Sequence, residues 1–217
     1  MNITPEPVEA YIDNLYKPLN SALAALRTQA ETDGFPVILK STETFLLNVI
    51  NIKKPKNILE IGTAVGYSAA CFAEKYKKCN IISIELDEET QEKAIQNLKD
   101  LGLSDRVTVL LGDAEEVIRE KLSGYRFDLV FIDAAKSHYR RFFNAAVTVC
   151  EDEAVIISDD VLLKGGTASD QYVKTRRHRT NIRNMREFVA YITTLSYADT
   201  SIVPIGAGVA LTTLHNK

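Results

Sequence analysis

The chain has 217 residues, of which 46% are hydrophobic and 25% are charged, and its formal net charge is −3. This composition excludes a disordered or fibrous chain and predicts one well-buried globular domain, and the whole-chain charge gives no reason to expect nucleic acid. The three cysteines lack the number and spacing of a disulfide framework or a metal site, which predicts buried thiols in a reducing cytoplasm. No signal peptide or membrane span is visible, so we expect a cytoplasmic protein without membrane contact.

Helices are predicted for the first 51 residues. Apolar residues recur every three or four positions over residues 6–33, and Pro18 divides this stretch into two helices. A third helix is expected over residues 41–51, with Ser41 or Thr42 as its cap. We therefore predict a single domain over residues 1–217, made of an N-terminal helical extension (1–51) and a core (57–217).

Strands and helices alternate regularly through the core. Strands are predicted at 57–61, 80–85, 106–110, 127–132 and 153–158, with helices at 66–76, 88–101, 114–121, 137–149 and 179–195. A terminal hairpin is expected over 199–205 and 207–214 around two glycines. Nearly continuous apolar strands separated by helices predict an α/β, Rossmann-like, doubly wound sheet. Seven strands are expected, mostly parallel, with an antiparallel strand from the hairpin.

The most informative stretch is residues 57–68, which read NILEIGTAVGYS. A buried strand runs into a turn containing Gly62 and Gly66, and a helix opens directly afterwards. Glycine allows close approach of the backbone to a ligand, and a helix start offers unpaired N–H groups. Glu85 ends the next strand, where a nucleotide-binding βαβ unit places its ribose-binding carboxylate. These features predict a ligand that contains adenosine.

Acidic residues also lie at or after the ends of the predicted parallel strands. Any one of them could simply cap a helix or stabilise a turn. Together they line the edge where open α/β sheets bind ligands. These residues are Glu60, Glu85, Asp113, Asp133, Asp159 and Asp160.

Asp133, Asp159 and Asp160 would bring three carboxylates together on neighbouring strand ends. Oxygen ligands without histidine or cysteine suit a hard cation such as Mg²⁺. Lys136 follows Asp133 by one helical turn and allows two interpretations. It is either a solvated lysine of a first turn or a general base whose pKa burial has lowered.

With these residues in view, the chain resembles the class I S-adenosylmethionine (SAM)-dependent methyltransferases. More narrowly, it is similar to the cation-dependent catechol and caffeoyl-CoA O-methyltransferases. The resemblance covers residues 36 to the end. It is carried by the motifs at residues 60–68, Glu85, 112–114, 131–136 and 158–162.

The resemblance implies a role for each matching position. Glu60, Gly62, Thr63, Gly66, Tyr67 and Ser68 would belong to the cofactor site, with the methionine end of SAM along the glycine turn. Glu85 would hold the ribose, Asp113 and Ala114 would flank the adenine, and Asp133 would border both cofactor and metal. Asp133, Asp159 and Asp160 would bind Mg²⁺ and Lys136 would be the catalytic base. Asp160 departs from the family, which usually has asparagine there.

The acceptor is suggested by a basic stretch at residues 174–186. This is either a solvated helix face or a phosphate-binding patch. The stretch, together with 160–165 and 204–208, resembles the bacterial tRNA 5-hydroxyuridine O-methyltransferases, although Ala207 replaces the aspartate expected there. That resemblance implies the anticodon loop of tRNA as substrate and a homodimer. The residues implied to hold RNA phosphates are Lys164, Arg176, Arg177, Arg179 and Arg183.

Three alternatives remain at this point. A small catechol or a phenolic CoA ester could replace tRNA as the acceptor. A nicotinamide oxidoreductase would have the same nucleotide-binding βαβ unit, but the acidic residues after the fourth and fifth strands would then have no explanation. A catalytically silent RNA-binding module would leave Asp133, Lys136 and Asp159 without a role.

Overall fold

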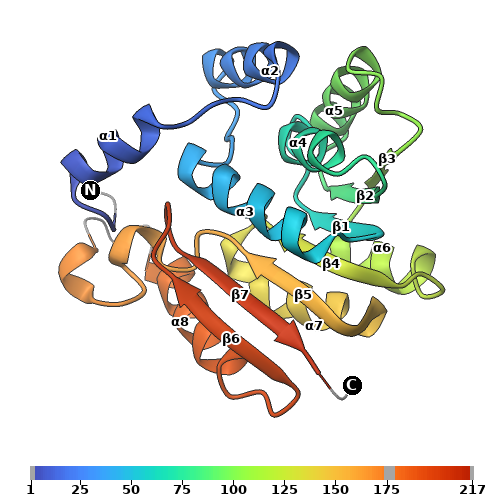
Figure 1. Ribbon diagram of the computed structural model, residues 1–217. Coiled ribbons are helices and arrows are strands. Elements are labelled where there is room, and N and C mark those ends of the chain that lie inside the picture. Colours follow the sequence, from blue (N-terminus) through green and yellow to red (C-terminus); the bar gives the residue numbers. More distant parts are fainter. Residues whose placement is uncertain (1–2, 174–178, 216–217) are drawn as a thin grey trace.

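The computed structural model describes residues 3–173 and 179–215 and has one central sheet (Figure 1). Seven strands lie in the order β3-β2-β1-β4-β5-β7-β6. The strands β1 to β5 pair in parallel, whereas β7 runs antiparallel to both β5 and β6. This confirms the predicted Rossmann-like sheet with an antiparallel strand from the terminal hairpin. The strands are β1 Asn57–Ile61, β2 Asn80–Glu85, β3 Val107–Leu111, β4 Phe127–Ile132, β5 Cys150–Ser158, β6 Ala198–Val203 and β7 Val209–Leu214.

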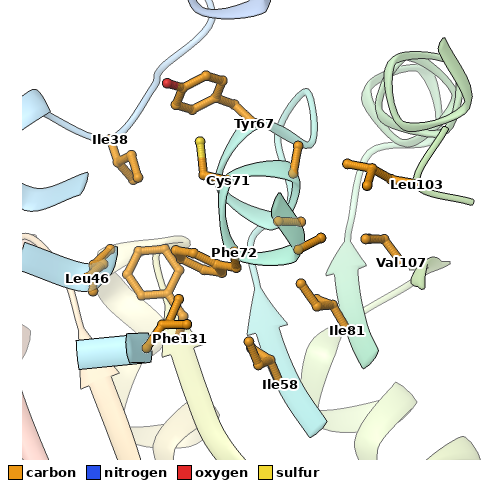
Figure 2. Close-up of a cluster of buried hydrophobic side chains, with 14 of the residues drawn as sticks. Ile38, Leu46, Ile58, Tyr67, Cys71, Phe72, Ile81, Leu103, Val107 and Phe131 are labelled. Carbon is orange, nitrogen blue, oxygen red and sulfur yellow. The ribbon is translucent and has the colours of Figure 1, made fainter. Parts of the chain in front are cut away.

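Helices cover both faces of the sheet because the inner strands are apolar on both sides. One core lies beneath α3 Lys40–Lys53, α4 Tyr67–Lys75 and α5 Glu88–Asp100. In this core Phe72 of α4 meets Phe131 of β4 edge to face, with Leu46 of α3 beside them (Figure 2). The opposite core lies beneath α6 Ala114–Lys121, α7 Tyr139–Val149 and α8 Arg179–Ile192. All three cysteines are free and buried, as predicted.

The N-terminal helices follow the sequence prediction except at one cap. Helices α1 Glu6–Asn14 and α2 Ser21–Thr32 are separated around Pro18. The expectation that Ser41 or Thr42 caps α3 is wrong, because the helix already begins at Lys40 and Leu39 occupies the cap position. Thr42 is instead fully buried and packs against Gly206 of the terminal hairpin.

Strand β5 begins at Cys150, earlier than predicted. Exposed acidic residues at 151–153 hide the strand signal in the sequence. The register also shifts between Phe127 and Leu129 of β4, where extra residues of β5 bulge and Glu153 takes a positive φ of 59°. Within residues 3–173 and 179–215, no helix is both long and apolar enough to cross a membrane.

Candidate active site

A cavity of about 570 Å³ opens at the carboxyl ends of the parallel strands. Its floor comes from the loops after β1, β2, β3, β4 and β5, which is where open α/β sheets bind ligands. Its roof is the segment 35–39, which precedes α3. The predicted residues that line it are Gly62, Thr63, Tyr67, Ser68, Glu85, Asp113, Ala114, Asp133, Lys136, Asp159 and Asp160.

The glycine turn after β1 brings three strand ends together. The N–H of Gly62 donates to the carbonyl of Ile84 at 3.0 Å. Gly62 has a φ of +98°, and a Cβ at this position would overlap the carbonyl oxygen of Asp133. Gly66 has a φ of +82° and precedes the first residue of α4. Glycine is therefore required here for backbone packing as well as for access to a ligand.

Glu60 lies beneath the turn and not among the residues that line the cavity. It is fully buried, and its carboxylate accepts hydrogen bonds from the hydroxyls of Ser68 and Ser83. Burial raises the pKa of Glu60 to about 7, although both hydroxyl donors act to lower it. In this structure Glu60 therefore supports Ser68, which does line the cavity, and its predicted place in the cofactor site stays a prediction. Its place inside a strand directs its side chain to a sheet face instead of beyond the strand end.

Glu85 and Asp113 lie at one end of the cavity and are already hydrogen-bonded. The Glu85 carboxylate accepts from the backbone N–H groups of Ala64 at 2.9 Å, Leu86 at 2.9 Å and Asp87 at 3.1 Å. A carboxylate has about four acceptor positions, so Glu85 retains capacity for a ligand hydroxyl. Asp113 caps α6 through the N–H of Glu115 at 3.0 Å, so its capping and cavity-lining roles coexist.

The other end of the cavity is acidic, with one lysine among the acids. Asp133 and Asp159 follow the neighbouring strands β4 and β5, and Asp160 comes next in the chain. The Lys136 ammonium lies 2.7 Å from Asp133 and 2.9 Å from Asp160. Burial, together with the charges of Asp133 and Asp160, raises the pKa of Asp159 well above its usual range. These side chains therefore form one electrostatically coupled group.

Lys136 does not have the lowered pKa that one of its two sequence interpretations requires. Burial by itself lowers its pKa, but Tyr139 and the carboxylates of Asp133 and Asp160 outweigh this effect, and the pKa lies well above its usual range. The Tyr139 hydroxyl also accepts from Lys136 Nζ at 3.0 Å and donates to the carbonyl of Asp159 at 2.9 Å. Lys136 is thus a charged partner of the acidic end in this structure.

Comparison with known proteins decides the family. The family model described as O-methyltransferase matches residues 18–214. The chain belongs to this O-methyltransferase family. A catechol O-methyltransferase of Mycobacterium tuberculosis is 31% identical over 169 residues, which cover 76% of each chain. A Staphylococcus aureus structure described as a caffeoyl-CoA O-methyltransferase has a TM-score of 0.89 at 27% identity, covering 96% of this chain and 100% of the other.

A further structural neighbour carries the cofactor product. The O-methyltransferase of Bacillus cereus, solved in complex with S-adenosylhomocysteine (SAH), has a TM-score of 0.83 at 23% identity. The alignment covers 96% of this chain and 97% of the Bacillus chain. Family membership removes two of the three alternatives that the sequence left open, because the protein is a SAM-dependent O-methyltransferase of the catechol and caffeoyl-CoA type. The nicotinamide oxidoreductase and the silent RNA-binding module are excluded.

The acidic end of the methyltransferase suits a hard cation by its chemistry. Three carboxylates without histidine or cysteine are the donor set that Mg²⁺ prefers. A positive charge already stands between two of them, because the Lys136 ammonium bridges Asp133 and Asp160. Within the described residues, no three acidic, histidine or cysteine side chains are gathered closely enough to form a ready metal cluster. The residues fit a divalent cation in charge and donor type, although in the described part of the chain the carboxylates are not gathered into a ready site and Lys136 pairs with two of them.

Of the five residues predicted to hold RNA phosphates, the structure describes three. Arg176 and Arg177 lie outside the described residues. Lys164, Arg179 and Arg183 are exposed, and Arg183 makes a long 3.9 Å contact with Glu187. Arg186, in contrast, is bound to the carbonyls of Gly166 and Thr167 and to Asp170, so it stabilises the fold.

Several site residues were missed from the sequence. Tyr139 accepts a hydrogen bond from Lys136. Phe142 and the roof segment 35–39 line the cavity. Arg27 and Glu43 are buried between the roof and the N-terminus of α4. The sequence does indicate that these two residues are unusual, because each is a charged residue on an otherwise apolar helix face. Arg27 shares its face of α2 with Leu23 and Ala30, and Glu43 shares its face of α3 with Leu46 and Leu47.

Proposed function

We propose that this enzyme methylates a hydroxyl group that is adjacent to a second oxygen, and that it uses a divalent cation such as Mg²⁺. Asp133, Asp159 and Asp160 would hold the cation. The observation that carries this proposal is the position of the three carboxylates at one end of the cavity whose other end has the features of a nucleotide site. The name of the catechol relative, whose substrate class has two adjacent hydroxyls, supports it.

The reaction transfers a methyl group from the sulfonium of SAM to the acceptor oxygen. The new O–C bond forms as the S–C bond breaks, which leaves SAH and releases the hydroxyl proton. The cation, when bound, supplies positive charge that favours the deprotonated acceptor oxygen. We propose Lys136 Nζ as the atom that takes this proton, which requires the neutral amine. With a cation held by Asp133 and Asp160, the Lys136 ammonium would lose its two charge partners and would release its own proton to solvent before the transfer. Holding the acceptor oxygen and the methyl carbon in line within the cavity would supply much of the remaining rate enhancement.

We propose 5-hydroxyuridine in the anticodon loop of tRNA as the acceptor. Its O4 and O5 atoms are adjacent oxygens, as in a catechol. A wobble base is already single-stranded and can be turned into a pocket. The exposed side chains of Lys164, Arg179 and Arg183 support this proposal, because they follow the acidic end in the chain and have charge to offer to flanking phosphates.

Nucleoside mass spectrometry tests the acceptor. Unmodified tRNA carrying 5-hydroxyuridine is incubated with the enzyme, SAM and Mg²⁺, and its nucleosides are analysed. We expect 5-methoxyuridine, and we expect its loss when EDTA is added or when Asp133 is changed to Ala. Product formation that EDTA leaves unchanged would remove the cation from the mechanism.

A small catechol is the second candidate acceptor, and the M. tuberculosis relative favours it. A parallel assay with a simple catechol separates the two candidates. Turnover of the catechol without any modification of tRNA would reject the tRNA proposal and would retain the cation-assisted chemistry.

We also propose a homodimer formed through α1. All side chains of α1 remain at least partly exposed, and its apolar residues share one face. Exposed apolar faces of this kind mark interaction sites. Light scattering should give twice the chain mass for the wild type and the single-chain mass for Tyr11→Glu with Leu15→Glu. The exposed apolar residues are Val8, Tyr11, Ile12 and Leu15.

A further inference from the structure

A buried polar cluster joins the N-terminal helices to the cofactor end of the cavity. It consists of Tyr16, Arg27, Glu43 and Tyr67. Arg27 and Glu43 are 6% and 0% exposed, respectively, and Tyr67, at the start of α4, is 3% exposed. Four segments that are distant in sequence therefore meet at one buried carboxylate.

The hydrogen bonds of the cluster converge on the carboxylate of Glu43. Glu43 Oε2 accepts from Arg27 Nη2 at 2.7 Å and from the Tyr67 hydroxyl at 2.8 Å. Glu43 Oε1 accepts from the Tyr16 hydroxyl at 3.0 Å. Arg27 Nε donates to the oxygen of Tyr67 at 3.2 Å, and the guanidinium carbon lies 4.7 Å from the centre of the Tyr67 ring. Arg27 thus fixes both the hydroxyl and the ring of Tyr67.

The same arginine holds the roof of the cavity. Arg27 Nη2 donates to the carbonyl of Ile38 at 2.8 Å, and Ile38 lies in the middle of the roof segment 35–39. Tyr67 belongs to the floor, directly after the glycine turn. Figure 2 shows Tyr67 and Cys71 projecting from α4 toward Ile38. One guanidinium therefore fixes the position of the roof relative to the floor.

Stability alone does not account for this arrangement. A buried ion pair costs desolvation that its attraction barely offsets, and apolar residues of similar size often stabilise a fold as well or better. A planar guanidinium adds directional specificity, because its N–H donors point in fixed directions within one plane. In this structure the N–H donors of Arg27 bind the Ile38 carbonyl, the Glu43 carboxylate and the Tyr67 hydroxyl oxygen at the same time.

We propose that Arg27 and Glu43 are positioning residues that hold the roof over the methionine end of SAM. They determine the affinity for the cofactor and leave the rate of methyl transfer almost unchanged. The inference rests on the placement of SAM along the glycine turn. It is independent of the identity of the acceptor.

Calorimetry with SAH tests this proposal on the intact enzyme. We expect Glu43→Gln to raise the Kd for SAH about tenfold, the effect of losing one charge-assisted hydrogen bond. The KM for SAM should rise by a similar factor, whereas kcat at saturating SAM should stay within about twofold. Glu31→Gln is the matched control, because it removes only the exposed contact of Arg27, 3.0 Å from its Nη1. That variant should bind SAH like the wild type.

A second variant keeps the test valid if Glu43→Gln fails to fold. Changing both Arg27 and Glu43 to Met replaces the ion pair by apolar side chains, which preserves stability and removes the link to Ile38. We expect this folded double variant also to bind SAH about tenfold more weakly. SAH affinity equal to that of the wild type in the folded double variant would overturn the proposal. A wild type that does not bind SAH would instead refute the cofactor placement.

Discussion

At the scale of single residues, Lys136 can act either as a charge partner of the carboxylates or as a proton acceptor. Its ammonium is held by Asp133 and Asp160, so charge balance and proton transfer are both available roles. We expect Lys136→Met to lower kcat by about 10² to 10⁴, the usual contribution of a positioned base. Lys136→Arg should be equally slow, because arginine keeps the charge but does not give up its proton. Single-turnover rates distinguish the roles: near wild-type rates for Lys136→Arg would make the lysine a charge partner only.

Glu60 should make stability depend on pH. Its pKa is raised from 4.5 to about 7 in the folded chain. Between these values the folded state keeps a proton that the unfolded state has lost, so the free energy of unfolding decreases as pH rises through this window. The fully buried carboxyl can account for up to about 3 kcal/mol of this decrease.

Glu60→Gln isolates this effect, because the amide does not titrate. Its oxygen can still accept from one of the two serine hydroxyls, and its NH2 group can donate to the other. Urea unfolding of both proteins is measured from about pH 5 to about pH 8. We expect the wild type to lose stability relative to the variant as pH rises. A constant difference across this range would show that the carboxyl does not titrate there.

At the scale of elements, the turn between β1 and α4 contains two glycines, Gly62 and Gly66, that are needed for different reasons. A Cβ at Gly62 would overlap the Asp133 carbonyl, whereas a Cβ at Gly66 would meet Ala94 and Leu98 at 3.4 Å. We expect Gly62→Ala to cost about 3 kcal/mol and to weaken SAH binding, and Gly66→Ala to cost about 1 kcal/mol from its φ alone. Urea unfolding and calorimetry measure both. Equal costs at the two positions would contradict the packing explanation.

The elements also show which parts of the fold the sequence could predict. The strand β1, the glycine turn and the acids at strand ends were predictable because their signals are local: apolar runs, glycine and spacing. The pairing of Arg27 with Glu43 was not predictable, because it depends on how α2 packs against α3. The direction in which the pKa of Lys136 shifts could not be predicted for a similar reason: it depends on the distances to Asp133 and Asp160, which no sequence pattern supplies.

At the scale of the whole molecule, the residues of the proposed site are divided between two halves of the sheet. The ends of β1, β2 and β3 carry the nucleotide features, and the ends of β4 and β5 carry the carboxylates. The N-terminal helices contribute the roof, and the basic start of α8 follows the acidic end in the chain. A large anionic acceptor would therefore contact charge outside the cavity in addition to the chemistry within it.

The salt dependence of tRNA binding tests this picture of the surface. The exposed side chains of Arg179 and Arg183 are expected to contact phosphates of the anticodon loop. Changing both to Ala should weaken tRNA binding and reduce the slope of log K against log salt by about 1.4, because each contact with a single strand contributes about 0.7. Arg119→Ala on α6 removes another exposed arginine and should leave the slope unchanged. Filter binding across salt concentrations measures these slopes, and identical slopes in all three proteins would place the phosphate contacts elsewhere.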